Sequence, residues 1–189
     1  MKYIKTIGMI SNVGQGRGFL GPNACAFSSD GNMFVLNSGL NRVTVQTFDE
    51  KYLTEFATWY GDKPGDKKLN TPSDLEFDSN DRLYITDEIN NAVFIYDVDG
   101  NFIGQWGKFG NNVGEFSGPS GIAIDSKDNL YVVDQYNHRI QKFTKDGKYI
   151  TSWGENGKKE GQFNMPWGIC VDNEDNIYVA DWRNDRIQK

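Results

Sequence analysis

The sequence contains few of the side chains on which enzyme sites commonly depend. Its 189 residues include a single histidine, His138, and two cysteines, Cys25 and Cys170. One histidine cannot supply the several imidazole ligands of a histidine-rich zinc site. Both cysteines lie in apolar runs, where cysteine acts as a small hydrophobe. Within the repeats described below they stand three and four residues after a proline, so their side chains point to opposite faces and a disulfide between them is not expected.

Several patterns that would assign a function are also absent. No 18-residue apolar run could span a membrane. The N-terminus, MKYIKTIG, lacks the apolar core of a secretory signal, so the sequence as written predicts no signal peptide and a cytoplasmic location is only the default expectation. The GxSxG, GxxxxGK[ST] and D-x-[DN]-x-[DN]-G motifs do not occur. The motifs therefore predict no catalytic residue, no metal and no cofactor.

What the sequence does contain is a long internal repeat. Pro22, Pro72, Pro119 and Pro166 stand 50, 47 and 47 residues apart. After each proline, apolar and polar residues alternate in short segments separated by polar turns, which is typical of half-buried strands. Repeats of about 40–50 residues with four strands each indicate a β-propeller. We therefore predict one all-β domain over residues 1–189.

The ends of the chain suggest how such a propeller could close. The repeats are approximately residues 22–61, 72–107, 119–154 and 166–189. Residues 2–8, KYIKTIG, match 148–154, KYITSWG, which is the fourth strand of its repeat. We expect the N-terminal strand to complete the last of four four-stranded blades and close the ring. Exchange of end strands between chains would give a homo-oligomer, and a piece of a six-bladed propeller is the alternative.

One segment carries a family resemblance. The run Asp134–Ile140 resembles the NHL repeat, named for an Asn-His-Leu-type tripeptide that stands here as Asn137-His138-Arg139. The openings PSGIAID (119–125) and PWGICVD (166–172) are similar to it as well. The resemblance extends over essentially the whole chain and implies a β-propeller, usually of six blades. We expect the repeated aspartate to cap a turn and the repeated arginine to bridge strands or blades.

The strand order gives the propeller two faces. The connection face holds the connections from the fourth strand to the next first strand and the turns between second and third strands. The turn face holds the remaining turns. Acidic residues gather on the turn face, whereas the connection face is near neutral with scattered lysines. Because the net charge is −6, we do not expect a nucleic acid partner.

Candidate binding residues stand where the repeats disagree on the connection face. Large Trp167 replaces small polar residues at the matching positions of the other repeats, and Trp182-Arg183 replaces pairs such as Ser38-Gly39. The fold does not demand such side chains, and Trp, Tyr and Arg are favoured binding anchors. Mutual packing of the two tryptophans is the structural alternative. The candidate ligand-binding residues are Trp182, Arg183, Trp167, Tyr136, His138, Glu88 and Asp74.

Two functional classes follow. The favoured hypothesis is a non-catalytic scaffold that binds a protein, a peptide or a small ligand on the connection face. The alternative is a metal-dependent enzyme similar to propeller lactonases or peptide-amidating lyases. Asp74 and Asn23 lie where calcium ligands of a lactonase could sit, whereas a single histidine cannot build the zinc site of such a lyase. His138 also has a structural interpretation, as a polar cap in a turn.

Overall fold

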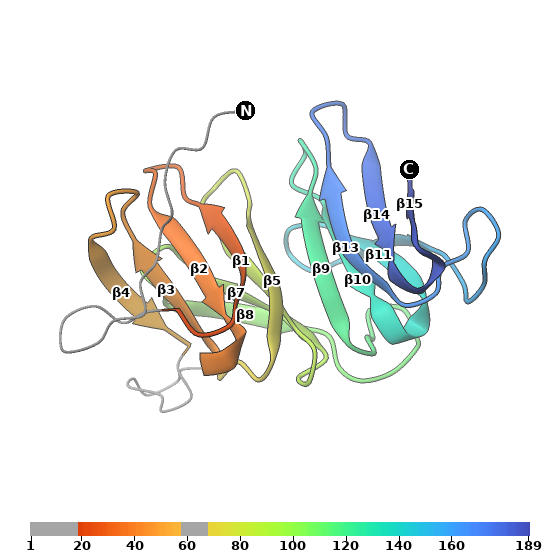
Figure 1. The fold of residues 1–189 in the computed structure, drawn as a ribbon, viewed down its shortest axis with the longest axis horizontal. Coiled ribbons are helices and arrows are strands. Elements are labelled where there is room, and N and C mark those ends of the chain that lie inside the picture. The colour runs from red at the N-terminus through yellow and green to blue at the C-terminus, as the bar shows by residue number, and fades with distance from the viewer. Residues whose placement is uncertain (1–18, 58–67) are drawn as a thin grey trace.

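The computed structural model describes residues 19–57 and 68–189. These residues form four successive antiparallel sheets, the blades, arranged around a common axis (Figure 1). Each strand pairs with its neighbours in sequence, so every blade is a simple meander. The predicted all-β propeller of four blades is confirmed.

The strands begin at the repeated prolines, as the spacing predicts. Blade 1 contains β1 (Pro22–Phe27), β2 (Met33–Asn37), β3 (Arg42–Gln46) and β4 (Tyr52–Phe56). Blade 2 contains β5 (Pro72–Phe77), β6 (Leu83–Asp87), β7 (Ala92–Tyr96) and β8 (Phe102–Trp106). Blade 3 contains β9 (Pro119–Ile124), β10 (Leu130–Asp134), β11 (Arg139–Phe143) and β12 (Tyr149–Trp153). Blade 4 contains β13 (Pro166–Val171), β14 (Ile177–Asp181) and β15 (Arg186–Gln188).

Short helical turns join the second and third strands of three blades. They are the 3₁₀ turns η1 (Ser38–Leu40), η2 (Gln135–Asn137) and η3 (Trp182–Asn184). Each is followed by a non-glycine residue in the left-handed conformation, which ends the turn. No helix of the described residues is long and apolar enough to cross a membrane.

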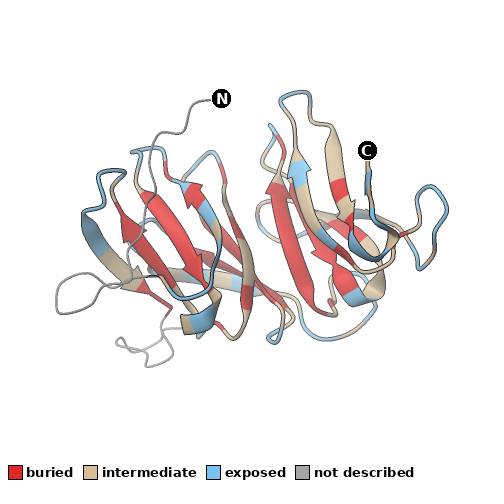
Figure 2. Cartoon of the chain, in the orientation of Figure 1, coloured by how far each residue is buried: buried red, intermediate tan, exposed pale blue. Residues whose placement is uncertain are grey.

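The apolar cores lie between blades rather than within them. Strand β10 shows why, because its side chains alternate between two clusters: Leu130 and Val132 pack with blade 2, and Tyr131 and Val133 pack with blade 4. All five residues of β10 are buried for this reason. In the end blades, β1 and β13 contain more exposed residues than β9, whereas all five residues of β2 are buried (Figure 2).

Plugs from the connections complete each core. Leu69, Phe116 and Phe163 each stand three residues before a blade's proline, and all three are buried. Phe116 lies 5.7 Å from Phe143 between ring centroids. These three residues therefore act as apolar plugs between successive blades.

A repeated pair of hydrogen bonds fastens the blades together on the turn face. A serine donates its backbone N–H and its hydroxyl to the two carboxylate oxygens of an aspartate in the next blade. The three pairs are Ser29–Asp81, Ser79–Asp128 and Ser126–Asp175, with N–H distances of 2.9, 3.0 and 2.9 Å. Many of the turn-face carboxylates are thus structural acceptors.

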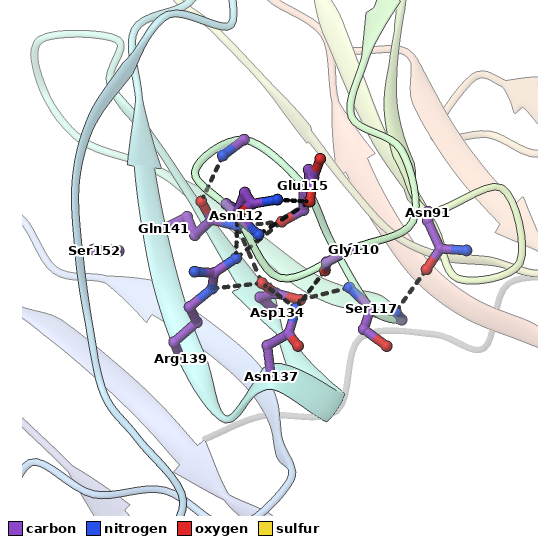
Figure 3. Close-up of polar contacts among 12 residues, drawn as sticks. Asn91, Gly110, Asn112, Glu115, Ser117, Asp134, Asn137, Arg139, Gln141 and Ser152 are labelled. Atoms are coloured by element: carbon purple, nitrogen blue, oxygen red, sulfur yellow. Dashed lines mark hydrogen bonds and ion pairs between the residues drawn. The ribbon is translucent and has the colours of Figure 1, made fainter.

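A buried carboxylate organises the other end of blade 3. Asp134 accepts hydrogen bonds from Ser117 N–H (2.7 Å), Asn137 Nδ2 (3.0 Å), Arg139 Nε (2.7 Å) and Gln141 Nε2 (3.1 Å) (Figure 3). The network joins the incoming connection, the turn and the third strand. The predicted bridging role of the arginine is confirmed, since Arg139 joins Asp134 to the connection carbonyls of Asn112 and Glu115. The aspartate does not cap the turn as predicted, because its side chain accepts no backbone N–H of η2.

The same network recurs in blade 4 but is incomplete in blade 2. Asp181 of blade 4 pairs with Arg186 at 2.8 Å. In blade 2, Ala92 stands where the other blades have the arginine. The buried Asp87 still accepts hydrogen bonds from the N–H groups of Asn70 and Asn90, but it has no arginine partner at that position. Burial raises the pKa of Asp87 to about 6.

The predicted closing strand, residues 2–8, lies outside the described residues. Within the described part, the inner strands pack in the order β1, β5, β9 and β13, and β1 makes no comparable contact with β13. Blade 4 has three described strands.

The Asp134 network makes a first prediction about stability. We expect Asp134→Ala to lower the free energy of unfolding by about 3–5 kcal/mol, because it leaves the largely buried Arg139 guanidinium without its carboxylate. Asp146→Ala is the control, since its ion pair with Arg82 is largely exposed and exposed pairs contribute about 0–1 kcal/mol. Urea denaturation followed by circular dichroism measures both, and equal losses would contradict the prediction.

Asp87 makes a second prediction, about pH. A carboxyl whose pKa is higher in the folded chain holds its proton more tightly when folded, so its contribution to stability is greatest at low pH. That contribution is lost as the pH rises from about 4 to about 6. Asp87→Asn, which copies Asn37 of blade 1, should remove ~1 kcal/mol of the stability difference between pH 5 and pH 7.5. Urea melts of both proteins at the two pH values test this; parallel pH profiles would exclude it.

Candidate functional site

Two exposed tryptophans meet on the connection face of blade 4. Trp167 is the second residue of β13, and Trp182 is the first residue of η3. Their rings are T-shaped, with centroids 6.3 Å apart. They nevertheless remain 49% and 54% exposed. The Arg183 guanidinium lies 5.2 Å from the Trp182 ring centroid, so three predicted residues form one cluster, the Trp–Arg cluster.

The backbone beneath the Trp–Arg cluster is fixed by neighbouring segments. The Ser120 hydroxyl in blade 3 donates to the Trp167 carbonyl at 2.8 Å. The Arg183 N–H donates to the Asn164 carbonyl at 3.1 Å. The exposed rings are therefore presented on a scaffold held by hydrogen bonds, which reduces the ordering cost of binding.

A second pair links blades 2 and 3 on the same face. The Tyr136 hydroxyl donates to Glu88 Oε1 at 2.8 Å, and this bond raises the pKa of Tyr136. The Tyr136 side chain is 46% exposed. One face of Tyr136 stays open to solvent while its hydroxyl is engaged, so it can offer apolar contact area to a partner.

The structure gives His138 a part in the junction between blades 3 and 4. His138 follows η2 in the left-handed conformation, with φ of 55°. Its Nδ1 accepts the Met165 N–H at 3.1 Å. The matching residues Asn41 and Asn91 accept the corresponding N–H groups of the next blades at 3.0 Å. The structural interpretation of His138 as a polar cap is supported, and the cap extends across the blade junction.

Asp74 likewise joins two blades. Its carboxylate accepts N–H groups of Leu75 at 2.9 Å and of Ile122, in blade 3, at 3.0 Å. Burial raises the pKa of Asp74 to about 6. Asn23, the other residue considered for calcium, donates to the carbonyls of Pro72 and Ser73 in blade 2. In residues 19–57 and 68–189 no group of three or more His, Cys, Asp and Glu side chains could hold a metal ion.

Two features of this face were not predicted from the sequence. Ile89 stands at the turn position of Tyr136 and is 58% exposed. It could have been found, because a large aliphatic residue in a polar turn is the same signal as Trp182. Ser120, by contrast, fastens Trp167 through a contact between blades, and only the packing of β9 against β13 reveals it.

Comparisons with known proteins agree with the β-propeller fold, and the first of them matches the six-bladed alternative. Residues 66–142 match a family described as a 6-bladed beta-propeller, and residues 163–189 match the NHL repeat. The chain is a β-propeller whose last blade matches the NHL repeat. No curated protein sequence matches the propeller.

Solved structures share the fold at low identity. The propeller is similar to a streptogramin B lyase structure, with 17% identity, a TM-score of 0.67 and coverage of 88% of this chain and 50% of that one. A virginiamycin B lyase from Staphylococcus aureus is 21% identical, with a TM-score of 0.66 and coverage of 88% of this chain and 54% of that one. An auxiliary nutrient binding protein from Bacteroides thetaiotaomicron is 20% identical, with a TM-score of 0.64 and coverage of 87% of this chain and 46% of that one. The chain spans about half the length of these structures.

The His138 contact makes a third prediction. His138→Ala removes the acceptor of the Met165 N–H, so we expect it to lower the free energy of unfolding by about 1 kcal/mol. His138→Asn is the control, because it copies Asn91, whose side-chain oxygen accepts the matching N–H, and it should stay close to the wild type. Urea denaturation measures both variants, and equal losses would contradict the prediction.

Proposed function

We propose that this propeller is a non-catalytic binding scaffold whose connection face recognises a protein, a peptide or a small ligand. The observation that carries the proposal is the exposure of the Trp–Arg cluster. Trp167 and Trp182 pack against each other, yet about half of each side chain remains open to solvent. Buried rings would belong to the core, whereas exposed rings on a fixed backbone are suited to binding.

The surroundings support the proposal. Exposed apolar side chains continue across the connection face at Leu20, Ile89 and Tyr136. Arg183 and the Glu88 carboxylate add one charge of each sign. Recognition surfaces commonly combine aromatic and charged side chains. The aromatic side chains lose their water at low cost, and the polar groups fix the orientation of the partner.

A double substitution tests this function. We expect Trp182→Ala with Arg183→Ala to shift the melting temperature by no more than about 2 °C, because exposed side chains contribute little to folding. A panel of peptides and small metabolites screened by biolayer interferometry should yield ligands that bind the wild type and bind the variant at least tenfold more weakly. Tyr52→Ala, an exposed aromatic on β4, is the matched control. A large fall in melting temperature would show that Trp182 stabilises the fold instead of serving binding. Unchanged binding by the variant would show that the ligands do not bind at the Trp–Arg cluster.

The alternative proposal is a metal-dependent lyase- or lactonase-like enzyme, and the lyases among the similar structures favour it. One matched structure is described as a catalytically inactive histidine-to-alanine variant of virginiamycin B lyase with quinupristin. Here the single histidine accepts a backbone N–H, and Asp74 accepts two. Elemental analysis of the purified protein separates the proposals, since about one calcium or zinc ion per chain would favour the enzyme.

A further inference from the structure

The glutamine that opens η2 is buried with an unpaired side-chain oxygen. Gln135 is 1% exposed, and its backbone N–H donates to the Gly118 carbonyl. Its Oε1 accepts no hydrogen bond from the described residues. Folded proteins rarely leave such an oxygen unpaired, because a buried acceptor without a donor lowers stability.

The repeat shows where this side chain lies. Gln135 stands at the position of Glu88 in blade 2. Glu88 reaches forward to the next blade, where its carboxylate accepts the Tyr136 hydroxyl at 2.8 Å. Since Arg183 of blade 4 stands at the position of Tyr136, we expect the same geometry to direct the Gln135 amide toward the Trp–Arg cluster.

Met165 covers this position from blade 4. It stands where blade 3 has Gly118, with a left-handed φ of 52° against 63°. A Cβ added at Gly118 would lie 3.5 Å from the Glu88 Cγ, and Met165 carries a Cβ at the matching place. We therefore expect the Met165 side chain to lie over Gln135. Methionine is unbranched and flexible, so it can move aside for a ligand.

The same residue explains how Arg183 is placed. In blade 3 the Tyr136 ring packs so closely on Gly118 that a Cβ there would clash with it. With Met165 at that place, Arg183 cannot copy Tyr136, and its guanidinium lies 5.2 Å from the Trp182 ring centroid instead. The exposed Trp–Arg cluster and the covered glutamine oxygen therefore adjoin each other.

Other side-chain oxygens on the connection face accept backbone N–H groups. Asn91 accepts that of Gly118 at 3.0 Å, and Asp134 accepts that of Ser117 at 2.7 Å. The Gln135 oxygen has the same accepting capacity but lacks such a donor in the described part of the chain. A peptide bound from outside can supply one.

We propose that the connection face binds a peptide and that Gln135 Oε1 accepts one of its backbone N–H groups. This inference rests on the proposed function and names the class of its ligand. An apolar side chain of the peptide packs on Trp167 and Trp182, whose rings are about half exposed. The Arg183 guanidinium donates to a peptide carbonyl, since each peptide group carries both a donor and an acceptor.

Replacing the amide by an apolar side chain tests the role of Gln135. A library of acetyl-capped hexapeptides is screened by fluorescence polarisation, and the hexapeptide that binds the wild type most tightly is the probe. Gln135→Met should bind this probe at least tenfold more weakly, because it has no acceptor. It should also melt about 2–4 °C higher, because no unpaired oxygen stays buried. Gln105→Met, at an exposed glutamine of β8, is the matched control and should change neither value.

Methylation of the peptide identifies the donor. Each analogue of the hexapeptide carries one backbone N–CH₃ in place of N–H, which removes one donor at a time. At one position the change should weaken binding to the wild type about tenfold and leave binding to Gln135→Met unchanged, since that variant has already lost the bond. Equal losses with both proteins at every position would contradict the hydrogen bond.

Met165→Gly tests the cover. Glycine suits the left-handed φ and copies Gly118. The variant should bind the hexapeptide about threefold more tightly, because no side chain has to move before the N–H reaches Gln135. Weaker binding would contradict a cover over Gln135, since it would show that Met165 itself contacts the peptide.

Other outcomes would overturn the inference. Unchanged binding by Gln135→Met, with binding lost in the variant that combines Trp182→Ala and Arg183→Ala, would leave the proposed function standing without this contact. Unchanged binding by both variants would contradict the proposed function as well. A lower melting temperature of Gln135→Met would show that the glutamine stabilises the fold. Binding of saccharides on a glycan array, with no hexapeptide bound, would replace the peptide by a hydroxyl donor.

Discussion

A single four-stranded sheet cannot bury both of its faces, and the whole structure depends on this constraint. Each apolar cluster draws its residues from two successive blades. Blade 3 has neighbours on both sides, and its strand β10 is buried on both sides, whereas β1 and β13 of the end blades are more exposed. The stability of every blade is therefore set by its neighbours, which is the usual behaviour of repeat proteins.

Hydrogen bonds at fixed positions orient the blades that burial holds together. Serine–aspartate pairs fasten one end of each junction, and an asparagine or His138 accepts a backbone N–H at the other. A buried polar group is costly without its partner. These bonds therefore select one register between blades, where apolar contact alone would tolerate several.

On the connection face, several large side chains take little part in the contacts between blades. Trp167, Trp182 and Arg183 occupy a backbone held by its neighbours while their side chains remain largely exposed. Residues at matching positions elsewhere, such as Ser120, serve the junctions instead. This division supports a binding scaffold in which the residues common to the repeats stabilise the fold, and the residues that differ between repeats serve recognition.

Sequence alone determined the β-propeller, its repeats and the exposed tryptophans, because strand alternation and matched spacing are local and periodic signals. It also indicated that the repeated Asp–Arg pair is structural. It could not decide that Asp74 and His138 bind the backbone of the next blade, nor that both cysteines are exposed rather than core residues. Those outcomes depend on contacts between residues about 30–50 positions apart in the chain, and only the packing of one blade on another brings them together.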